Sequence, residues 1–202
     1  MMRIYDITQE LFSSKVFPGD PAPERRVLGR IDDGDVCNLT AFSMCAHNGT
    51  HIDAPYHFIN GGKTVDSLPL EVLVGRCFVA EHHGIVTAED ARAIIASAVA
   101  IDKSSAKRIL IKGDAVLSLA AAEIFASMGL VLYGNESQTV GPEDAPMAVH
   151  KVLLGADIVL LEGIRLAAVP VGVYLLNAAP LNLGGADGAP CRAWLMNVEC
   201  NE

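Results

Sequence analysis

Residues 109–134, ILIKGDAVLSLAAAEIFASMGLVLYG, decide the fold class, because they contain two short apolar runs on either side of a helix-like segment. The runs at 109–113 and 130–134 have the length and aliphatic content of buried strands. Between them, residues 118–129 begin at Ser118, which can cap a helix, and end at Gly129, which can stop one. The stretch therefore predicts a strand–helix–strand unit.

The same alternation extends in both directions. Downstream, a helix over 144–154 carries Pro146 near its first turn, and an apolar strand follows at 157–163. Upstream, a strand at 75–81 precedes a helix start at Thr87, which Asp90 can complete as a capping box. Repeated strands and helices predict an α/β core.

The two ends of the chain are less regular and contain more strand than helix. Residues 16–24 hold three prolines and turn or extend, whereas small and β-branched residues favour a strand at 36–45. Near the C-terminus we expect an extended segment at 172–183, a turn at 184–190 and a closing strand at 191–198. The prediction is one domain over 1–202 of class α/β (mixed α+β), with a mixed β-sheet.

Composition excludes several classes of function. Of the 202 residues, 51% are hydrophobic, which is enough for a sizeable core, and the net charge is −9, which disfavours nucleic-acid binding. We find no signal-peptide pattern and no apolar run of about 18 residues that could span a membrane. Five cysteines without a CxxC pair argue against a disulfide framework. We therefore expect a soluble, cytoplasmic protein.

The stretch HNGTHIDAPYHF, residues 47–58, holds three of the six histidines and one aspartate. Asn48-Gly49 is a turn signal and Pro55 follows, so the segment is more typical of a strand or loop than of a helix. In an extended segment His51 and Asp53 point to the same side, and the turn can fold His47 back towards them. Two imidazoles and a carboxylate suit Zn²⁺ or a similar divalent ion, although an incidental cluster is the alternative.

Further ligands would have to come from elsewhere in the chain. Glu162 ends a predicted buried strand, where an unpaired carboxylate is costly. His150 lies in the helix before it, where it is either a further ligand or an ordinary packed helix residue. His57 could complete the metal site or act beside it as a general base. His82-His83 favours a surface turn, and Cys45 favours a small core residue over a soft ligand.

The chain resembles the cyclase family, which includes bacterial kynurenine formamidases and isatin hydrolases. Residues 47–58 are similar to the family signature H-x-G-T-H-x-D-x-P-x-H-F at every fixed position. The similarity continues through YDIT and FPGDP near the start, LPLEVLVGRC, LSLAAAEIFASMGLVLYGNES, HKVLLGADIVLLEGIRL and APLNLGGADGAPCRA. The resemblance therefore covers nearly the whole chain.

The resemblance implies a swivelling β/β/α fold that assembles as a homodimer or homotetramer. It also implies a site for one or two divalent ions, Zn or Mn, at which a C–N amide bond is hydrolysed. It matches His47, His51 and Asp53 to the ligands of a first metal, with Asp53 bridging where two ions bind. It matches His150 and Glu162 to a second metal and His57 to the catalytic histidine.

The chain departs from the family pattern at two positions. Phe17 stands where kynurenine formamidases typically have Trp, and Glu136 stands where an Asp is frequent. Neither is a proposed metal ligand. An aryl substrate is expected to rest against Phe17, Phe58 or Tyr56.

The sequence thus predicts a metal-dependent amidohydrolase acting on a small aryl amide or lactam, most like kynurenine formamidase. One alternative is another reaction at the same site, either opening of a lactam or cyclic imide, or a cyclisation or dehydration. A metal-binding protein without turnover is an alternative of a different class.

Overall fold

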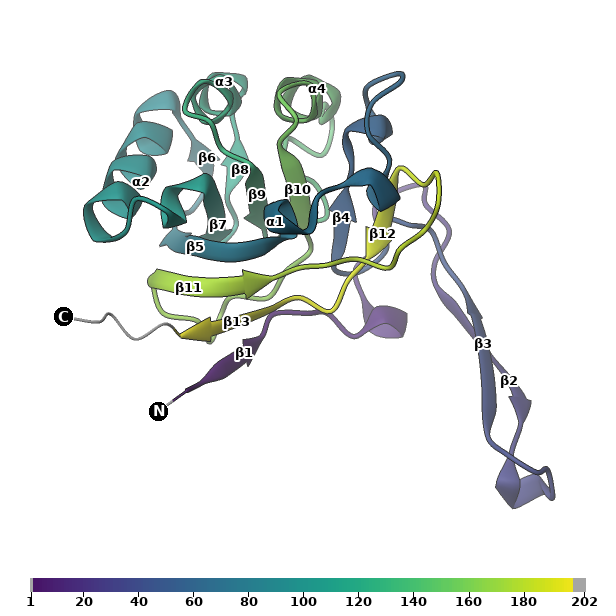
Figure 1. Ribbon diagram of the computed structural model, residues 1–202. Coiled ribbons are helices and arrows are strands. Elements are labelled where there is room, and N and C mark those ends of the chain that lie inside the picture. The colour runs from purple at the N-terminus through teal and green to yellow at the C-terminus, as the bar shows by residue number, and fades with distance from the viewer. Residues whose placement is uncertain (1, 198–202) are drawn as a thin grey trace.

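The computed structural model describes residues 2–197, and its central feature is a curled nine-stranded mixed sheet (Figure 1). The strand order is β1-β13-β11-β5-β7-β9-β10-β4-β12. The bounds are β1 Ile4–Asp6, β4 His51–Asp53, β5 Val74–Glu81, β7 Arg108–Lys112, β9 Leu132–Asn135, β10 Val159–Glu162, β11 Gly172–Asn177, β12 Gly188–Pro190 and β13 Trp194–Asn197. The mixed α/β class is confirmed.

The middle of the sheet is parallel and buried on both faces. Strands β5, β7, β9 and β10 pair in parallel, each with the next. Leu110 and Leu161 belong to one core cluster, while their neighbours Ile109, Ile111 and Leu160 belong to the other. Apolar residues on both faces explain why these strands read as continuous apolar runs and not as alternating ones.

Three helices cover one face of this parallel region, as Figure 1 shows: α2 Ala88–Ile101, α3 Leu119–Ser127 and α4 Met147–Gly155. The predicted caps are present: Thr87 and Asp90 form a capping box on α2, and Ser118 accepts from Ala121 N at the start of α3. Gly129 has a φ of +74°, as a helix stop requires. A short helix, α1, spans Leu70–Leu73, and 3₁₀ turns occupy Leu11–Ser13, Ile31–Asp33, Pro55–His57, Val65–Ser67 and Ser105–Lys107.

Several predicted boundaries were wrong. The helix expected from 144 begins at Met147, because residues 144–146 form a turn before it. The turn expected at 184–190 ends earlier, because Gly188–Pro190 pairs with β4 as the edge strand β12. Pro190 is tolerated there because an edge strand needs fewer ladder donors. Residue 198 of the predicted closing strand lies outside the described residues.

Two smaller sheets stand apart from the main one. Strands β6 Ile85–Val86 and β8 Val116–Leu117 pair in parallel, and β2 Glu24–Gly29 pairs with β3 Leu39–Ser43 as an antiparallel hairpin. The hairpin projects from the body as an arm (Figure 1). Residues 36–38 and 44–45, also expected in a strand, lie outside β3. Within residues 2–197, no helix is long and apolar enough to cross a membrane.

Candidate metal centre and active site

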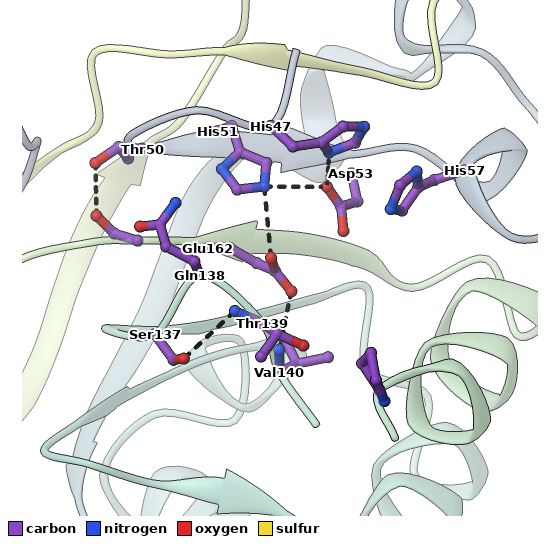
Figure 2. Close-up of polar contacts among 12 residues, drawn as sticks. His47, Thr50, His51, Asp53, His57, Ser137, Gln138, Thr139, Val140 and Glu162 are labelled. Carbon is purple, nitrogen blue, oxygen red and sulfur yellow. Dashed lines mark hydrogen bonds and ion pairs between the residues drawn. The ribbon is translucent and has the colours of Figure 1, made fainter. Parts of the chain in front are cut away.

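The site is built on β4, which lies between β10 and β12. His51 and Asp53 lie two apart on this strand, so both side chains leave the same face, as the i, i+2 spacing predicts. His51 is also opposite Glu162 on β10 in the antiparallel register. His51 Nε2 lies 3.3 Å from Asp53 Oδ1 and 3.4 Å from Glu162 Oε2. Pairing of two strands thus brings together an imidazole and two carboxylates (Figure 2).

A tight turn before β4 brings His47 to the same point. Asn48 N donates to Cys45 O over 3.2 Å, and Cys45 N donates to the Asn48 side chain over 2.9 Å. Gly49 follows with a φ of +67°, which favours glycine. His47 Nδ1 then lies 2.8 Å from Asp53 Oδ1, so the predicted folding back of His47 occurs.

His150 reaches the cluster from α4. Its Nε2 lies 3.1 Å from Glu162 Oε1 and 3.7 Å from Asp53 Oδ2, while Nδ1 is held 2.9 Å from Pro146 O. Glu162 Oε1 also accepts a bond from Val140 N over 2.9 Å. The five predicted ligands, His47, His51, Asp53, His150 and Glu162, therefore meet in one cluster.

The donor set fits a divalent cation. His51, Asp53 and Glu162 are only 1%, 1% and 2% exposed, yet His51 Nε2 and Asp53 Oδ2 have no hydrogen-bond partner. Buried polar atoms normally have a partner, so two unpartnered atoms on residues of one possible ligand group are consistent with a cation site there. Ligand atoms of His51, Asp53 and Glu162 lie within 4.8 Å of one another, as do those of His47, Asp53 and His57. Imidazole with carboxylate is a donor set that Zn²⁺ and similar ions accept.

The electrostatics of the cluster also call for positive charge. Burial disfavours the charged form of His51, but the nearby carboxylates of Asp53 and Glu162 outweigh it and raise its pKa to about 9. Burial likewise opposes protonation of His47, but Asp187 and Asp53 raise its pKa to about 11. Burial would raise the pKa of Asp53, yet bonds and charge from His47 and His51 hold it well below its usual value. A bound cation would replace these protons as the compensating charge.

Asp187, just before β12, connects two of the histidines. Its Oδ2 lies 2.9 Å from His47 Nε2 and 3.1 Å from His57 Nδ1. With Nε2 bonded to Asp187, His47 directs Nδ1 to Asp53 in the cluster, an orientation that would suit a carboxylate–histidine–metal arrangement. No role for Asp187 follows from the local sequence pattern, and the only available signal was its place in the APLNLGGADGAPCRA segment that resembles the family.

Residues behind the cluster fix its backbone. Gln138 donates to Gly49 O over 3.0 Å and accepts from Gln9 over 2.6 Å, so the turn after His47 is tied to the loop after β9. Glu136 accepts from Gly113 N and Leu166 N, each over 2.8 Å. The departure at Glu136 therefore supports the neighbouring loops and lies outside the metal cluster.

An open cavity of about 210 Å³ gives access to the cluster. This volume is below the roughly 300–1,000 Å³ typical of drug-sized ligands and so favours a small one. Its walls are Phe17, Asp20, His47, His51, His57, Phe58, Gln138, Thr139, Pro146, His150 and Glu162. Phe17 and Phe58, two of the residues expected to contact an aryl substrate, both line this cavity.

Four other residues considered from the sequence do not line the cavity. Tyr56 is 45% exposed and does not line the cavity. Cys45 is half-buried in the turn before His47 and belongs to neither ligand group. His83 is an exposed partner of Asp114, and His82 bonds to Ile85 O, which confirms the surface turn.

The chain was compared with known proteins. A family model described as "Putative cyclase" matches residues 5–140. A kynurenine formamidase of Erythrobacter litoralis is 33% identical over 97% of this chain and 94% of its own length, and one of Sphingopyxis alaskensis is 32% identical over 98% and 100%.

Solved structures also match this chain over nearly its whole length. A predicted metal-dependent hydrolase from Bacillus stearothermophilus is 28% identical, with a TM-score of 0.80 over 98% of this chain and 100% of its own. Isatin hydrolase A from Labrenzia aggregata, at 23% identity and a TM-score of 0.83 over 98% and 94%, shows the same fold. With the signature residues gathered at one buried cluster and these matches along the chain, the protein belongs to the cyclase family.

Proposed function

We propose that this protein is a metal-dependent hydrolase of a C–N amide bond, most like an arylformamidase that converts N-formylkynurenine to kynurenine and formate. One observation carries the proposal: a buried His/Asp/Glu cluster with unpartnered ligand atoms lies at a cavity that His57 also lines, and Asp187 bonds to His57. Relatives at about a third identity are kynurenine formamidases, which supports the same reaction class.

The proposed ligand sets are those that the family resemblance implies, and their five residues lie in one cluster. His47, His51 and Asp53 would hold a first ion, and His150 and Glu162 would hold a second, with Asp53 between the two. One or two ions of Zn or Mn suit these donors. Such an ion would lower the pKa of a water molecule and polarise the amide carbonyl.

The proton transfers are assigned to His57. Its Nδ1 is anchored to Asp187, which leaves Nε2 to accept a proton from the attacking water. The new C–O bond forms at the amide carbon. When the C–N bond breaks, His57 returns the proton to the departing nitrogen, because an arylamide anion is a poor leaving group. Water and amide thus become carboxylic acid and amine, and His57 ends as it began.

Phe17 and Phe58 are assigned to binding the aryl ring. Phe58 packs against His57, with ring centroids 4.5 Å apart, and against His150 at 4.7 Å. An aryl ring stacked there lies next to both the proton carrier and the cluster. Aromatic contacts of this kind contribute about 0.5–1.5 kcal/mol beyond burial.

The test combines metal analysis with turnover. The purified protein is measured for bound metal and assayed with N-formylkynurenine, other aryl formamides and isatin. His51→Ala should lose both metal and hydrolysis, whereas His57→Ala should keep metal and lose turnover. His83→Ala, which changes a surface histidine, should keep both. Retention of metal and activity by His51→Ala would refute the ligand assignment.

Opening of a lactam or cyclic imide uses the same chemistry, and isatin in the panel tests it. A protein that holds metal but hydrolyses no amide would be the non-catalytic alternative.

We also propose that the protein is cytoplasmic and forms a homodimer or homotetramer. The assembly is proposed because four apolar residues of the β2–β3 arm are at least half exposed: Leu28, Ile31, Leu39 and Phe42. Sedimentation velocity of the purified protein tests the assembly.

A further inference from the structure

A sharp turn at residues 17–20 forms one wall of the cavity. Phe17 O accepts a hydrogen bond from Asp20 N over 3.1 Å, and Gly19 has a φ of +99°. Pro18 and Gly19 at the two central positions are typical of a type II turn, in which the first and fourth residues lie within about 7 Å. The turn therefore presents an aromatic ring and a carboxylate side by side, and both line the cavity.

The Asp20 carboxylate has no stabilising partner within residues 2–197. The structure gives its side chain no hydrogen bond and no ion pair, although the residue is half-buried. The carboxylates that form or support the cluster each have a partner: Glu162 bonds to Val140 N and His150, Asp187 bonds to two histidines, and Asp53 Oδ1 lies 2.8 Å from His47 Nδ1. Asp20 is the acid at the cavity that remains available to a ligand.

The charge around the cavity gives this carboxylate a defined preference. Its walls contain no lysine and no arginine among the described residues, and its histidines belong to the cluster. A ligand group that reaches the turn thus meets negative charge and the face of Phe17. An ammonium group is stabilised by both, through a charge-assisted hydrogen bond and a cation–π contact. A carboxylate at the same position on the ligand is repelled by the Asp20 carboxylate.

We propose that Asp20 determines specificity by binding an ammonium group on the side chain of the aryl amide, with Phe17 as its aromatic wall. This inference rests on the proposed amidohydrolase function and names its substrate class: aryl amides whose ring substituent ends in a primary amine. Asp20 belongs to neither group of possible ligand atoms, so we assign it to substrate binding and not to the chemical step.

Four aryl formamides share the same reacting group and differ in the charged groups that their side chains carry. N-formylkynurenine carries an ammonium and a carboxylate, and N-formylkynuramine carries the ammonium alone. The desamino analogue of N-formylkynurenine carries the carboxylate alone, and 2-formamidoacetophenone carries neither. The wild-type protein should hydrolyse the ammonium-bearing pair with the higher kcat/KM. Asp20→Asn should lower kcat/KM about tenfold for that pair, mostly through KM, because hydrogen bonds to charged groups are worth about that much.

Matched variants identify the cause. Asp20→Asn should leave the neutral substrate within about twofold and improve the carboxylate-only one, while Asp20→Glu should restore part of the ammonium preference. Glu24→Gln removes an equal charge from the nearby arm and should change nothing. An equal loss for all four substrates in Asp20→Asn would mean a structural role and would overturn the proposal.

Binding separates this inference from the proposed function. Calorimetry with kynuramine, an aryl ketone with an ammonium chain, and with neutral 2-aminoacetophenone needs no turnover. Kynuramine should bind more tightly to the wild-type protein, and Asp20→Asn should remove the difference. If none of the four substrates is hydrolysed but kynuramine still binds more tightly than 2-aminoacetophenone, the amidohydrolase function is refuted and Asp20 is still assigned as the ammonium site. Equal binding of the two amines would refute the Asp20 inference alone.

Discussion

Asp187 Oδ2 lies 3.1 Å from Nδ1 of His57, so a carboxylate orients the proposed proton carrier. Asp187→Asn should lower kcat by about 10–100-fold, because residues that orient ligands and catalytic histidines typically contribute that much. The amide can still bond to one histidine but carries no charge to stabilise a protonated ring. Steady-state kinetics with an aryl formamide and metal analysis check this together. An unchanged kcat would show that His57 needs no anchor.

Gly188 leaves no room for a side chain beside His47. A Cβ at this position would lie 2.6 Å from His47 Cε1 and 2.7 Å from Ile52 O, so Gly188→Ala must displace the imidazole or the strand. We expect weaker metal binding and lower activity. Gly184→Ala is the matched control, because its Cβ would meet nothing within 4 Å. Titration with Zn²⁺ should separate the two variants; equal affinities would contradict the steric argument.

Metal should stabilise the fold. A ligand at 100 times its Kd adds about 2.7 kcal/mol to the free energy of unfolding, and a chain of this size gains roughly 2–4 °C in Tm per kcal/mol. Chelation should therefore lower Tm by several degrees. Glu162→Gln should reduce the metal-dependent shift, whereas His83→Ala should retain it in full. Thermal melts with and without chelator provide the measurement, and a Tm insensitive to metal in the wild-type protein would argue against the buried site.

Helix α2 depends on its capping box. Thr87 Oγ1 accepts from Asp90 N, and Asp90 Oδ2 accepts from Thr87 N over 2.9 Å. Thr87→Ala should lower the free energy of unfolding by about 1 kcal/mol, with activity unchanged. Ser97→Ala, on the exposed side of the same helix, should stay within about 0.5 kcal/mol of the wild type. Urea titrations followed by circular dichroism will distinguish the two.

The cysteines should differ sharply in reactivity. Burial raises the pKa of the Cys77 and Cys191 thiols to about 12, so almost no thiolate forms at pH 8 in the folded protein. Cys37 is exposed in the β2–β3 arm. Labelling with a disulfide reagent should modify Cys37 rapidly and should reach Cys77 and Cys191 only on unfolding, as peptide mass mapping would report. Modification of Cys77 in the native protein would contradict its burial.

Local patterns predicted much of the fold and of the cluster. The strand–helix units follow from apolar runs and caps such as Thr87 and Ser118, which depend only on nearby residues. The approach of His51 and Asp53 follows from the period of a strand, and that of His47 from the turn at Gly49. The roles of these residues, and of His57, remain predictions until metal and turnover are measured.

Features that depend on distant pairing could not be predicted in the same way. Residues 184–190 look like a turn, and Gly188–Pro190 becomes a strand only because β4 offers a partner. Asp187 reaches His47 across 140 residues of chain, a separation that no local pattern encodes. In the arm, β3 lies within the strand predicted at 36–45, whereas β2 was missed because prolines before Glu24 suggested a loop and its partner β3 is distant in sequence.

The position of Asp187 has a consequence for biosynthesis. The carboxylate that anchors two histidines emerges from the ribosome long after the HNGTHID stretch, and β12 must pair with β4 before it reaches them. Contacts between distant residues form late, because closing a long loop costs entropy before the contact repays it. A growing chain therefore carries its histidines without their anchor until residues 187–190 have been made and β12 has paired with β4.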